Sequence, residues 1–455
     1  MSNSLFNEFE PISAKQWKQK IQFDLKGADY NDALVWASNE GIQVKPFYHS
    51  DDVLIPTKPP KTTTSNFKIC ETIFVANAEN ANKKARLAIS SGANSIKFII
   101  PSDTISIKIL LVNINLGEVV IHFQLQFLSL EFIQQLSEIQ KKSEIYIHTD
   151  IIGHLAKTGN WCLNLKEDFS IFESAISYAN SFSINADLYQ NAGANMVQQL
   201  AYAMAHTNEY FNHIENISKE QSAKHNVVYN IAIGTNYFFE IAKLRALRLL
   251  FETLNKVYNT NYNCHILATP SKRNKAIYDY NTNMLRTTTE CMSAVLGGAD
   301  TICNLPYDAI FHKHNNFSAR IARNQLLILK HESYFNAVNN PSDGSYYIES
   351  LTEQLAEKAL TLFKDIEANG GFLKQLKDGT IQRKIKESAT KEEEQFTGGS
   401  EVILGSNKYP NTNDKMKENL DIYPFVKFEK RKTLIVPIIE KRLTENLEQK
   451  RLKKE

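Results

Sequence analysis

The sequence has few cysteines, and none of them forms a recognisable pair. Five cysteines are scattered over 455 residues, and no CxxC motif occurs. Zinc fingers use closely spaced pairs, and disulfide frameworks usually have an even number of cysteines, so the sequence indicates neither. Scattered, unpaired cysteines are typical of a reducing compartment, and we predict a cytoplasmic location.

An excess of charge of either sign is also absent. The 52 basic and 50 acidic residues give a formal net charge of +2, which supplies no general field for nucleic acid or an anionic membrane. The N-terminus has no basic start followed by an apolar run, so no secretion signal is expected. Apolar stretches such as Ile107–Val112 are far shorter than the ~20 residues that span a bilayer. We therefore predict neither a nucleic-acid partner nor membrane association.

Between residues 66 and 335 the sequence alternates between strand-like and helix-like segments, and 43% of all residues are hydrophobic. The expected strands are Phe67–Val75, Ser95–Ile100, Val119–Leu125, Ile145–His148, Phe182–Ala186, Val227–Ile233, His265–Ala268 and Thr301–Leu305. Eight strands with helices between them match a (β/α)₈ TIM barrel, an α/β fold of typically about 250 residues. A doubly wound open sheet is the alternative, because alternation alone does not show that the sheet closes.

An arm is expected before the barrel, over residues 1–62, with the barrel over residues 63–340. Ser13 is a candidate N-cap for a helix over Trp17–Leu25. An extended apolar segment then runs from Trp36 to Tyr48. So many large apolar side chains outside a helix predict docking, either on the chain's own barrel or on a partner subunit.

Residues 341–455 are expected to form a helical extension and a charged tail. A helix is predicted over Ile348–Glu367, before the turn at Gly370-Gly371. The last 30 residues are rich in lysine and glutamate around one apolar patch, Leu434–Ile439. We predict that this tail is an extended strap with a frayed helical end and that its charges form a solvated face.

The block from Asn283 to Asp308 combines a helix, a glycine pair and a buried strand. Gly297-Gly298 is expected to end the helix, because glycine adopts positive φ without a Cβ penalty. Polar residues then follow the strand at its C-terminal end, where barrel enzymes put their chemistry. Asn283 and Arg286 lie one helical turn apart, and we expect this arginine mainly to tie the helix to neighbouring loops.

This block, NMLRTTTECMSAVLGGADTICNLPYD, resembles the last barrel helix and strand of the methylmalonyl-CoA mutase family. Four more segments resemble the family in order: DLKGADYNDALVWASNEGIQVKPFYHSDD (24–52), IAIGTNYFFEIAKLRALRLLF (231–251), FSARIARNQLLIL (317–329) and NPSDGSYYIESLTEQLAEKAL (340–360). The resemblance covers about residues 15 to 410. It implies a barrel that, in active members, binds an acyl-CoA thioester along its axis.

The resemblance also implies where the cofactor is held. In the family a separate flavodoxin-like domain binds adenosylcobalamin through a histidine in an Asp-x-His-x-x-Gly motif. This sequence has no such motif, and His312 and His314 lie in FHKHNN, beside the barrel, in a different setting. The residues after Tyr409 are too few for such a domain. We therefore expect adenosylcobalamin on a large partner subunit and not on this chain.

Several positions that carry chemistry in active members are occupied here by other residue types. With Ala192-Gly193 as the anchor of the register, the family's catalytic histidine falls on Leu188. Leucine neither donates a hydrogen bond nor carries charge, so the polarising contact to the thioester carbonyl is lost. The positions that we regard as degenerate are Thr72, His148, Thr158, Asp187, Leu188 and Ala268. In the family, Thr72 corresponds to a first-strand tyrosine, His148 to a strand-end polar run and Thr158 to an arginine. Asp187 corresponds to a second tyrosine and Ala268 to a glutamine.

These losses favour the family's small, non-catalytic subunit, which forms a heterodimer with a large mutase subunit and meets acyl-CoA only through that partner. Two alternatives remain open. The barrel is active with a separately supplied cobalamin protein, or it is a vestigial barrel that still binds CoA. A new acid group of Asp187 and Tyr189 with His148 is a further, minor alternative.

Overall fold

The computed structural model describes residues 8–52, 64–141, 143–217, 225–427 and 431–455. Its main sheet has eight strands in the order β6-β5-β4-β3-β10-β9-β8-β7, and all of its neighbouring strands are parallel. Strands β6 and β7 also lie side by side, because the Ile147 amide donates to Ser181 Oγ (2.8 Å) and the Ser183 amide donates to Thr149 O (3.2 Å). The sheet therefore closes into a (β/α)₈ barrel, as predicted, and the open-sheet alternative is wrong.

The strands are close to their predicted bounds. They are β3 Lys68–Phe74, β4 Ser95–Ile100, β5 Val120–Leu125, β6 Ile145–His148, β7 Ser181–Asn185, β8 Asn226–Ile233, β9 Asn263–Pro270 and β10 Thr301–Cys303. Two differ more than the rest. Strand β9 is longer than expected because β8 pairs with it over its whole length, from Asn226↔Asn263 to Ile233↔Pro270. Strand β10 is two residues shorter than expected, because its pairing with β3 ends at Cys303 and its pairing with β9 ends at Ile302. The side chain of Asn304 donates to Ala322 O of helix α12 (2.9 Å).

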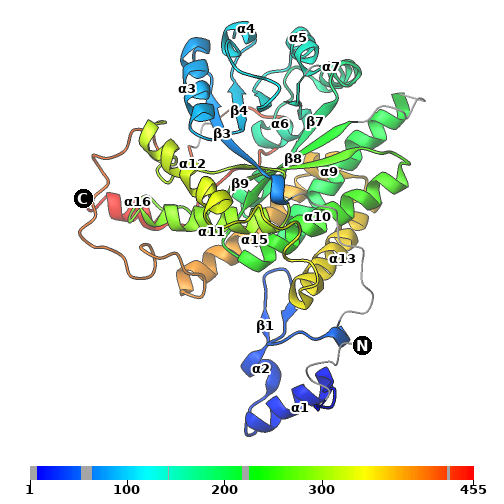
Figure 1. The fold of residues 1–455 in the computed structure, drawn as a ribbon, viewed down its shortest axis with the longest axis vertical. Helices are drawn as coiled ribbons and strands as arrows, with labels where there is room; N and C mark the ends of the chain where they lie inside the picture. Colours follow the sequence, from blue (N-terminus) through cyan, green and yellow to red (C-terminus); the bar gives the residue numbers. More distant parts are fainter. Residues whose placement is uncertain (1–7, 53–63, 142, 218–224, 428–430) are drawn as a thin grey trace.

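Helices surround the sheet and cover its outer face (Figure 1). They are α3 Ala78–Ser90, α4 Ile107–Leu110, α5 Leu130–Gln140, α6 Ile151–Thr158, α7 Leu165–Tyr178, α8 Asp187–Asn191, α9 Met196–Ile217, α10 Tyr237–Val257, α11 Thr282–Leu296 and α12 Asn316–His331. Gly298 follows α11 with φ +83°, so the glycine pair makes the expected turn into β10. None of the helices in the described ranges combines the length and the apolar composition needed to cross a bilayer.

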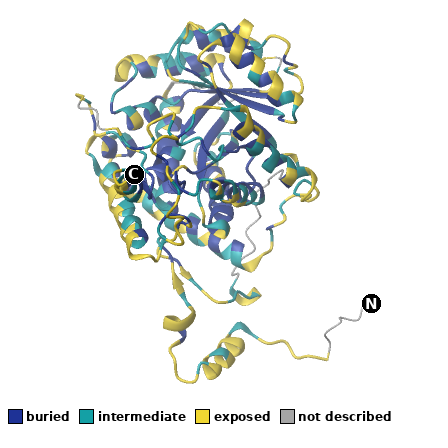
Figure 2. Cartoon of the chain, turned by 90° about the vertical axis from the view of Figure 1, so that its left-hand side faces the viewer, coloured by how far each residue is buried: buried dark blue, intermediate teal, exposed yellow. Residues whose placement is uncertain are grey.

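The arm has two parts that differ in how they contact the barrel. Helix α1, Ala14–Asp24, begins after the predicted N-cap Ser13 and has no buried residue. After α2 (Tyr30–Leu34) comes a hairpin of β1 (Trp36–Ala37) and β2 (Gln43–Val44), in which Ile42 is fully buried. Trp36 also packs edge-on against Phe239 of α10, with ring centroids 5.7 Å apart. The hairpin thus docks on the chain's own barrel, while α1 stands away from it and is mostly exposed (Figures 1 and 2).

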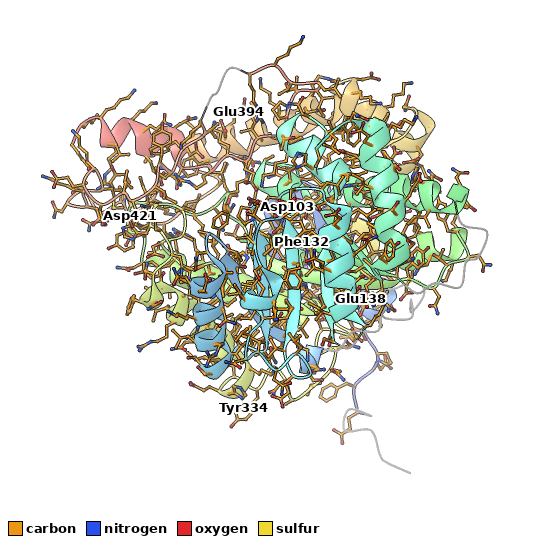
Figure 3. The ribbon with its side chains drawn as sticks, turned by 90° about the horizontal axis from the view of Figure 1, so that it is seen from above. Asp103, Phe132, Glu138, Tyr334, Glu394 and Asp421 are labelled. Atoms are coloured by element: carbon orange, nitrogen blue, oxygen red, sulfur yellow. The ribbon has the colours of Figure 1, made fainter. Side chains whose placement is uncertain are left out.

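The extension after the barrel packs against barrel helices. It consists of α13 (Tyr346–Ala368), α14 (Phe372–Lys377) and α15 (Thr380–Gly398). Leu351, Leu355 and Ala359 of α13 are buried in the same core cluster as residues of α9 and α10. Arg245 of α10, itself buried, pairs with Glu349 of α13 (2.6 Å) and with Asp343. Figure 3 shows the side chains of the barrel and this extension from above, with Tyr334 and Glu394 labelled on opposite sides.

The charged tail is packed against the barrel, so the prediction of a solvated face is wrong for Arg442, Glu445 and Glu448, which are buried, whereas Lys432, Lys450 and Lys453 are exposed. We call residues 431–455 the strap; it includes α16, Glu445–Leu452. Ile435, Ile438 and Leu443 are buried, as are the polar Thr444 and Glu448. Burial is possible because the apolar patch finds the barrel core and because the charges are paired, for example Arg442 with Glu448 (2.7 Å).

Candidate functional site: the barrel lumen and its rim

The lumen of the barrel is filled by large side chains. In the strand register Lys97, His122 and Tyr146 are paired neighbours on β4, β5 and β6, so they project from the same face of the sheet. His122 packs on Tyr146 with ring centroids 4.9 Å apart, and His265 of β9 packs on Tyr146 at 4.2 Å. His148 lies edge-on to His122 at 5.3 Å. All five side chains are buried, so aromatic and amine groups occupy the barrel axis.

Hydrogen bonds hold these side chains in fixed positions. Asn230 Nδ2 donates to His148 Nδ1 (3.2 Å) and to Asn185 Oδ1 (2.8 Å), and Lys97 Nζ donates to Asn230 Oδ1 (3.2 Å). His148 Nε2 then donates to His122 Nδ1 (3.1 Å), the direction that the Asn230 contact requires. Both ring nitrogens of His148 are therefore engaged inside the barrel.

The lumen histidines are neutral near pH 7. Burial, together with the neighbouring histidines and Lys97, holds the pKa of His122 and of His148 well below the usual value. Burial also lowers the pKa of His265, which hydrogen-bonds Thr301 Oγ1 at 3.1 Å. For His122 and His148 the fixed charge that acts on the ring is Lys97, which has the same sign as a protonated imidazole. For His265 burial outweighs the opposing effect of the Asp300 and Glu144 carboxylates.

Helix α8 begins with Asp187 and Leu188, the two positions where the resemblance places a tyrosine and a histidine. Leu188 is only 3% exposed and belongs to the apolar core cluster. Asp187 is partly buried and makes no hydrogen bond or ion pair with any described residue. Burial and the nearby Glu440 raise the pKa of the Asp187 carboxyl, while Lys97 counteracts this. Leu188 is therefore apolar and enclosed, whereas Asp187 is an acid without a partner among the described residues.

Tyr189 does not join His148. Its hydroxyl lies 2.9 Å from His206 Nδ1, and His206 Nε2 lies 2.9 Å from Asp150 Oδ1, which also accepts from Tyr210 (2.8 Å). The structure thus ties Tyr189 into a buried network between α8, α9 and the N-cap of α6. The hypothesis of an acid group formed by Asp187 and Tyr189 with His148 is wrong.

The other degenerate positions are spread over the barrel and do not form a constellation. Thr72 lies on β3 beside Lys97 of β4, near the mouth of the lumen. Thr158 ends α6, and its hydroxyl donates to the carbonyls of His154 and Asn160 (both 2.9 Å). Ala268 lies within β9, not after it, and is buried in the core cluster between sheet and helices. Its side chain consequently does not face the lumen.

The polar residues of the block after residue 283 have structural partners. Asn283 donates to the carbonyls of Ala276 and Tyr307 (both 2.9 Å). Arg286 donates to Asn283 Oδ1 (2.7 Å) and to Leu404 O (2.6 Å), so it ties α11 to neighbouring loops, as predicted.

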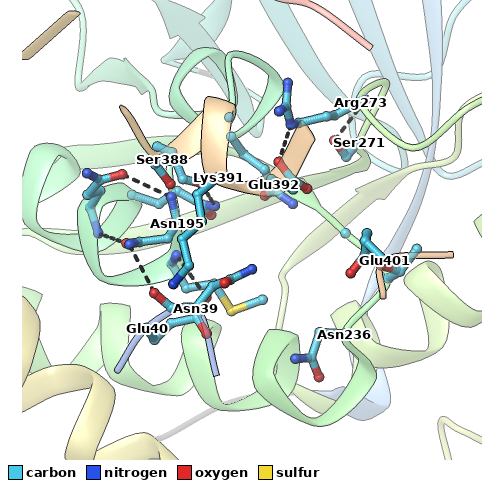
Figure 4. Close-up of a pocket in the computed structure, with 18 of the residues that line it drawn as sticks. Asn39, Glu40, Asn195, Asn236, Ser271, Arg273, Ser388, Lys391, Glu392 and Glu401 are labelled. Atoms are coloured by element: carbon cyan, nitrogen blue, oxygen red, sulfur yellow. Dashed lines mark hydrogen bonds and ion pairs between the residues drawn. The ribbon is translucent and has the colours of Figure 1, made fainter. Parts of the chain in front are cut away.

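A cavity of about 480 Å³ lies beside the lumen, at the rim formed by the loops after β7, β8 and β9. Helix α15 and the arm hairpin complete its wall, with Arg273 paired to Glu392 on one side and Asn39 and Glu40 on another (Figure 4). Behind it Lys243 is buried against Glu240 (2.6 Å) and Gln190 (2.9 Å). This cavity was not predicted from the sequence. The EIAK run of α10, with a carboxylate and an amine one turn apart, was the available signal.

His312, one of the two histidines beside the barrel, has no free ring nitrogen to offer a cobalamin. His312 approaches Asp308 through Nδ1 (3.3 Å) and Asn419 through Nε2 (3.2 Å), so both ring nitrogens are in use. Burial lowers the pKa of His314, which stands on the same exposed loop. No group of three or more histidine, cysteine or acidic side chains within the described ranges is arranged to hold a metal ion.

The family model and the relatives found by sequence agree on one family. The family model for methylmalonyl-CoA mutase matches residues 100–453. A methylmalonyl-CoA mutase small subunit of Porphyromonas gingivalis is 33% identical over 446 residues, covering 90% of this chain and 71% of that protein. The methylmalonyl-CoA mutase of Rhizobium meliloti is 29% identical, covering 90% of this chain and 65% of that protein.

More distant relatives extend the same pattern. The human mitochondrial methylmalonyl-CoA mutase is 26% identical, covering 89% of this chain and 62% of that protein. The chain thus spans less than two thirds of the Rhizobium and human relatives. Among solved structures, a Yersinia pestis dihydropteroate synthase covers 59% of this chain at 12% identity with a TM-score of 0.31, which is too low to bear on the argument. The family match and the small-subunit relative show that the chain belongs to the methylmalonyl-CoA mutase family.

Proposed function

We propose that this chain is the non-catalytic small subunit of a heterodimeric methylmalonyl-CoA mutase. Its large partner subunit would carry adenosylcobalamin and perform the radical interconversion of methylmalonyl-CoA and succinyl-CoA in the cytoplasm. The observation that carries the proposal is the filled lumen: Lys97, His122, Tyr146, His148 and His265 occupy the axis along which active members hold acyl-CoA. The small-subunit relative supports the same assignment.

The degenerate positions support the proposal independently of the lumen. Leu188 offers no proton or hydrogen bond where the resemblance places a catalytic histidine, and it lies inside the apolar core. Thr72, Thr158 and Ala268 carry no ionisable group, and Asp187 makes no hydrogen bond or ion pair within the described part of the chain. The role left to the chain is binding: a subunit that binds the folded form of its partner stabilises that partner by mass action.

Helix α1 supplies a surface suited to such binding. Its large apolar side chains Trp17 and Phe23 are 49% and 78% exposed, and Phe9 and Ile12 just before it are also exposed. Exposed aromatic groups of this kind are typical of interface anchors. We propose that α1 docks on the large subunit.

A co-expression experiment tests the proposal. The chain is expressed with the large mutase subunit encoded beside it, purified through a tag on one partner, and assayed with adenosylcobalamin and methylmalonyl-CoA. We expect a one-to-one heterodimer that is active, whose activity Asp187→Asn in this chain leaves unchanged. Turnover by this chain alone, or with an added cobalamin protein, would instead favour the barrel that works with a separately supplied cofactor domain.

A further inference from the structure

The strap crosses the carboxyl-terminal mouth of the barrel and is bonded to its rim by backbone hydrogen bonds. Five strap amides donate to rim carbonyls: Leu434 and Ile435 to Gly159 O (2.9 and 3.1 Å), Ile438 to Ala156 O (2.8 Å), Lys441 to Asn191 O (3.0 Å) and Leu443 to Arg273 O (2.9 Å). These carbonyls belong to the segments that follow β6, β7 and β9. One stretch of chain therefore links three separate rim segments.

A buried ion pair anchors the far end of the strap. Arg442 Nη2 lies 2.7 Å from Glu448 Oε2, and these side chains are 6% and 1% exposed. Arg442 Nη1 also donates to Lys275 O (2.9 Å), and Glu448 Oε1 accepts from the Ile277 amide (2.9 Å). The ion pair lies within the strap, and its bonds to Lys275 O and to the Ile277 amide attach this end of the strap to the segment after β9.

The middle of the strap contacts the rim segments that follow β7 and β9. Glu440 accepts from Asn191 Nδ2 (3.2 Å) and lies 3.7 Å from Lys272 Nζ. The Asp187 carboxyl interacts electrostatically with both Glu440 of the strap and Lys97 of the lumen. Lys97 is only 8% exposed, makes one hydrogen bond, and has no ion pair with any described residue. Buried amines without a counter-ion are expensive and reactive once they are exposed.

We propose that the strap is a built-in seal: it holds the rim segments after β6, β7 and β9 together and keeps solvent and ligands away from Lys97 in the lumen. This goes beyond the proposed function, since it concerns this chain alone and needs no partner. The fit of Gly159 supports it. This residue has φ +81°, and an added Cβ would lie 2.7 Å from Ile435 O, so the rim has no room for a side chain beneath the strap.

Chemical labelling of Lys97 tests the seal. Lysines are reductively methylated with formaldehyde and cyanoborohydride, and the rate at residue 97 is read by peptide mass spectrometry against exposed Lys83 in the same chain. In the intact chain we expect Lys97 to react at least tenfold more slowly than Lys83. A chain that ends at Lys430 lacks the strap and should label Lys97 at least tenfold faster than the intact chain does.

A single substitution tests the seal in the full-length chain, so that the test does not depend on the folding of the truncated chain. Gly159→Ala is expected to lift the strap, increase hydrogen exchange at the Leu434 and Ile438 amides, and accelerate labelling of Lys97. Gly379→Ala is its matched control, because Gly379 has a similar φ of +73° but nothing within 4 Å of an added Cβ. The proposal is overturned if Lys97 labelling stays within twofold of the intact chain while the strap is absent or exchanges freely.

Discussion

At the scale of single residues, the lumen histidines make stability depend on pH. Their folded-state pKa values lie below the usual 6.5, so the folded barrel binds fewer protons than the unfolded chain in acid. The stability is complete above the unfolded pKa near 6.5 and is lost as the pH falls below it. Each such histidine costs about 1.4 kcal/mol per pH unit in that window. We therefore expect the free energy of unfolding, measured in urea, to drop steeply between pH 6.5 and 5.5.

Replacing one of these histidines should reduce that slope. His265→Phe keeps an aromatic ring on Tyr146 but removes one titrating group, so the pH dependence is expected to fall by at most about 1.4 kcal/mol per pH unit. His331→Gln is the control, because His331 is an exposed residue at the end of α12. An equal loss of slope in both variants would contradict the assignment of the pH dependence to the lumen.

Leu188 allows a second test at this scale. Restoring the family's histidine with Leu188→His places an imidazole in the apolar core, where an unpaired polar group costs about 1–3 kcal/mol in addition to the lost apolar contacts. We expect a lower midpoint in urea unfolding and no turnover of methylmalonyl-CoA. Leu188→Met conserves volume and should cost less than about 1.5 kcal/mol. A gain of mutase activity in the histidine variant would show that only this contact is missing.

At the scale of elements, the arm separates into a part that serves the fold and a part that does not. The hairpin buries Ile42 and contacts Phe239, whereas α1 buries nothing. The double variant Trp17→Ser/Phe23→Ser should therefore leave the melting temperature of the isolated chain unchanged. Its affinity for the large subunit should fall at least tenfold, because an aromatic anchor typically contributes about 2 kcal/mol or more. Titration calorimetry measures that affinity.

A charge variant on the same helix provides the comparison. Lys15→Ser changes an exposed side chain of α1 without removing apolar surface, so it should bind the large subunit as tightly as the original chain. Equal affinity in all three proteins would place the interface elsewhere on the molecule.

Elements also show what the sequence could and could not predict. Strands such as β4 and helices such as α3 were predictable, because each depends on local periodicity and on caps that lie within the segment. The length of β9 was not, because it depends on pairing with β8. The burial of the strap was not predicted for a similar reason. Its charged composition is typical of a solvated segment, whereas the contacts that bury it form only in the folded chain. They include the ion pair of Arg442 with Glu448 and the hydrogen bond from Arg442 to Lys275 O.

At the scale of the whole molecule, the lumen could not be predicted because inward and outward positions alternate along each strand, and only the register between strands fixes which is which. His122 was not singled out from the sequence, yet it contacts Tyr146 and His148 at the centre of the barrel. The candidate positions read from the resemblance turned out to be spread over lumen, core and helix ends. Filling of the axis is thus a property of the assembled barrel and belongs to no single motif.

A filled axis leads to a prediction for the intact chain. Methylmalonyl-CoA or free CoA at concentrations up to about 1 mM should give no binding heat with this chain alone, because entry would require moving Lys97 and several packed rings, and cores resist such repacking by kilocalories per mole. The heterodimer should bind with one site for each pair of subunits, which serves as the positive control. Saturable binding of CoA to the isolated chain would favour the vestigial CoA-binding barrel instead. If that binding survived Lys97→Met and His265→Phe, the ligand would lie outside the lumen, and the rim cavity beside Arg273 would be the place to look for it.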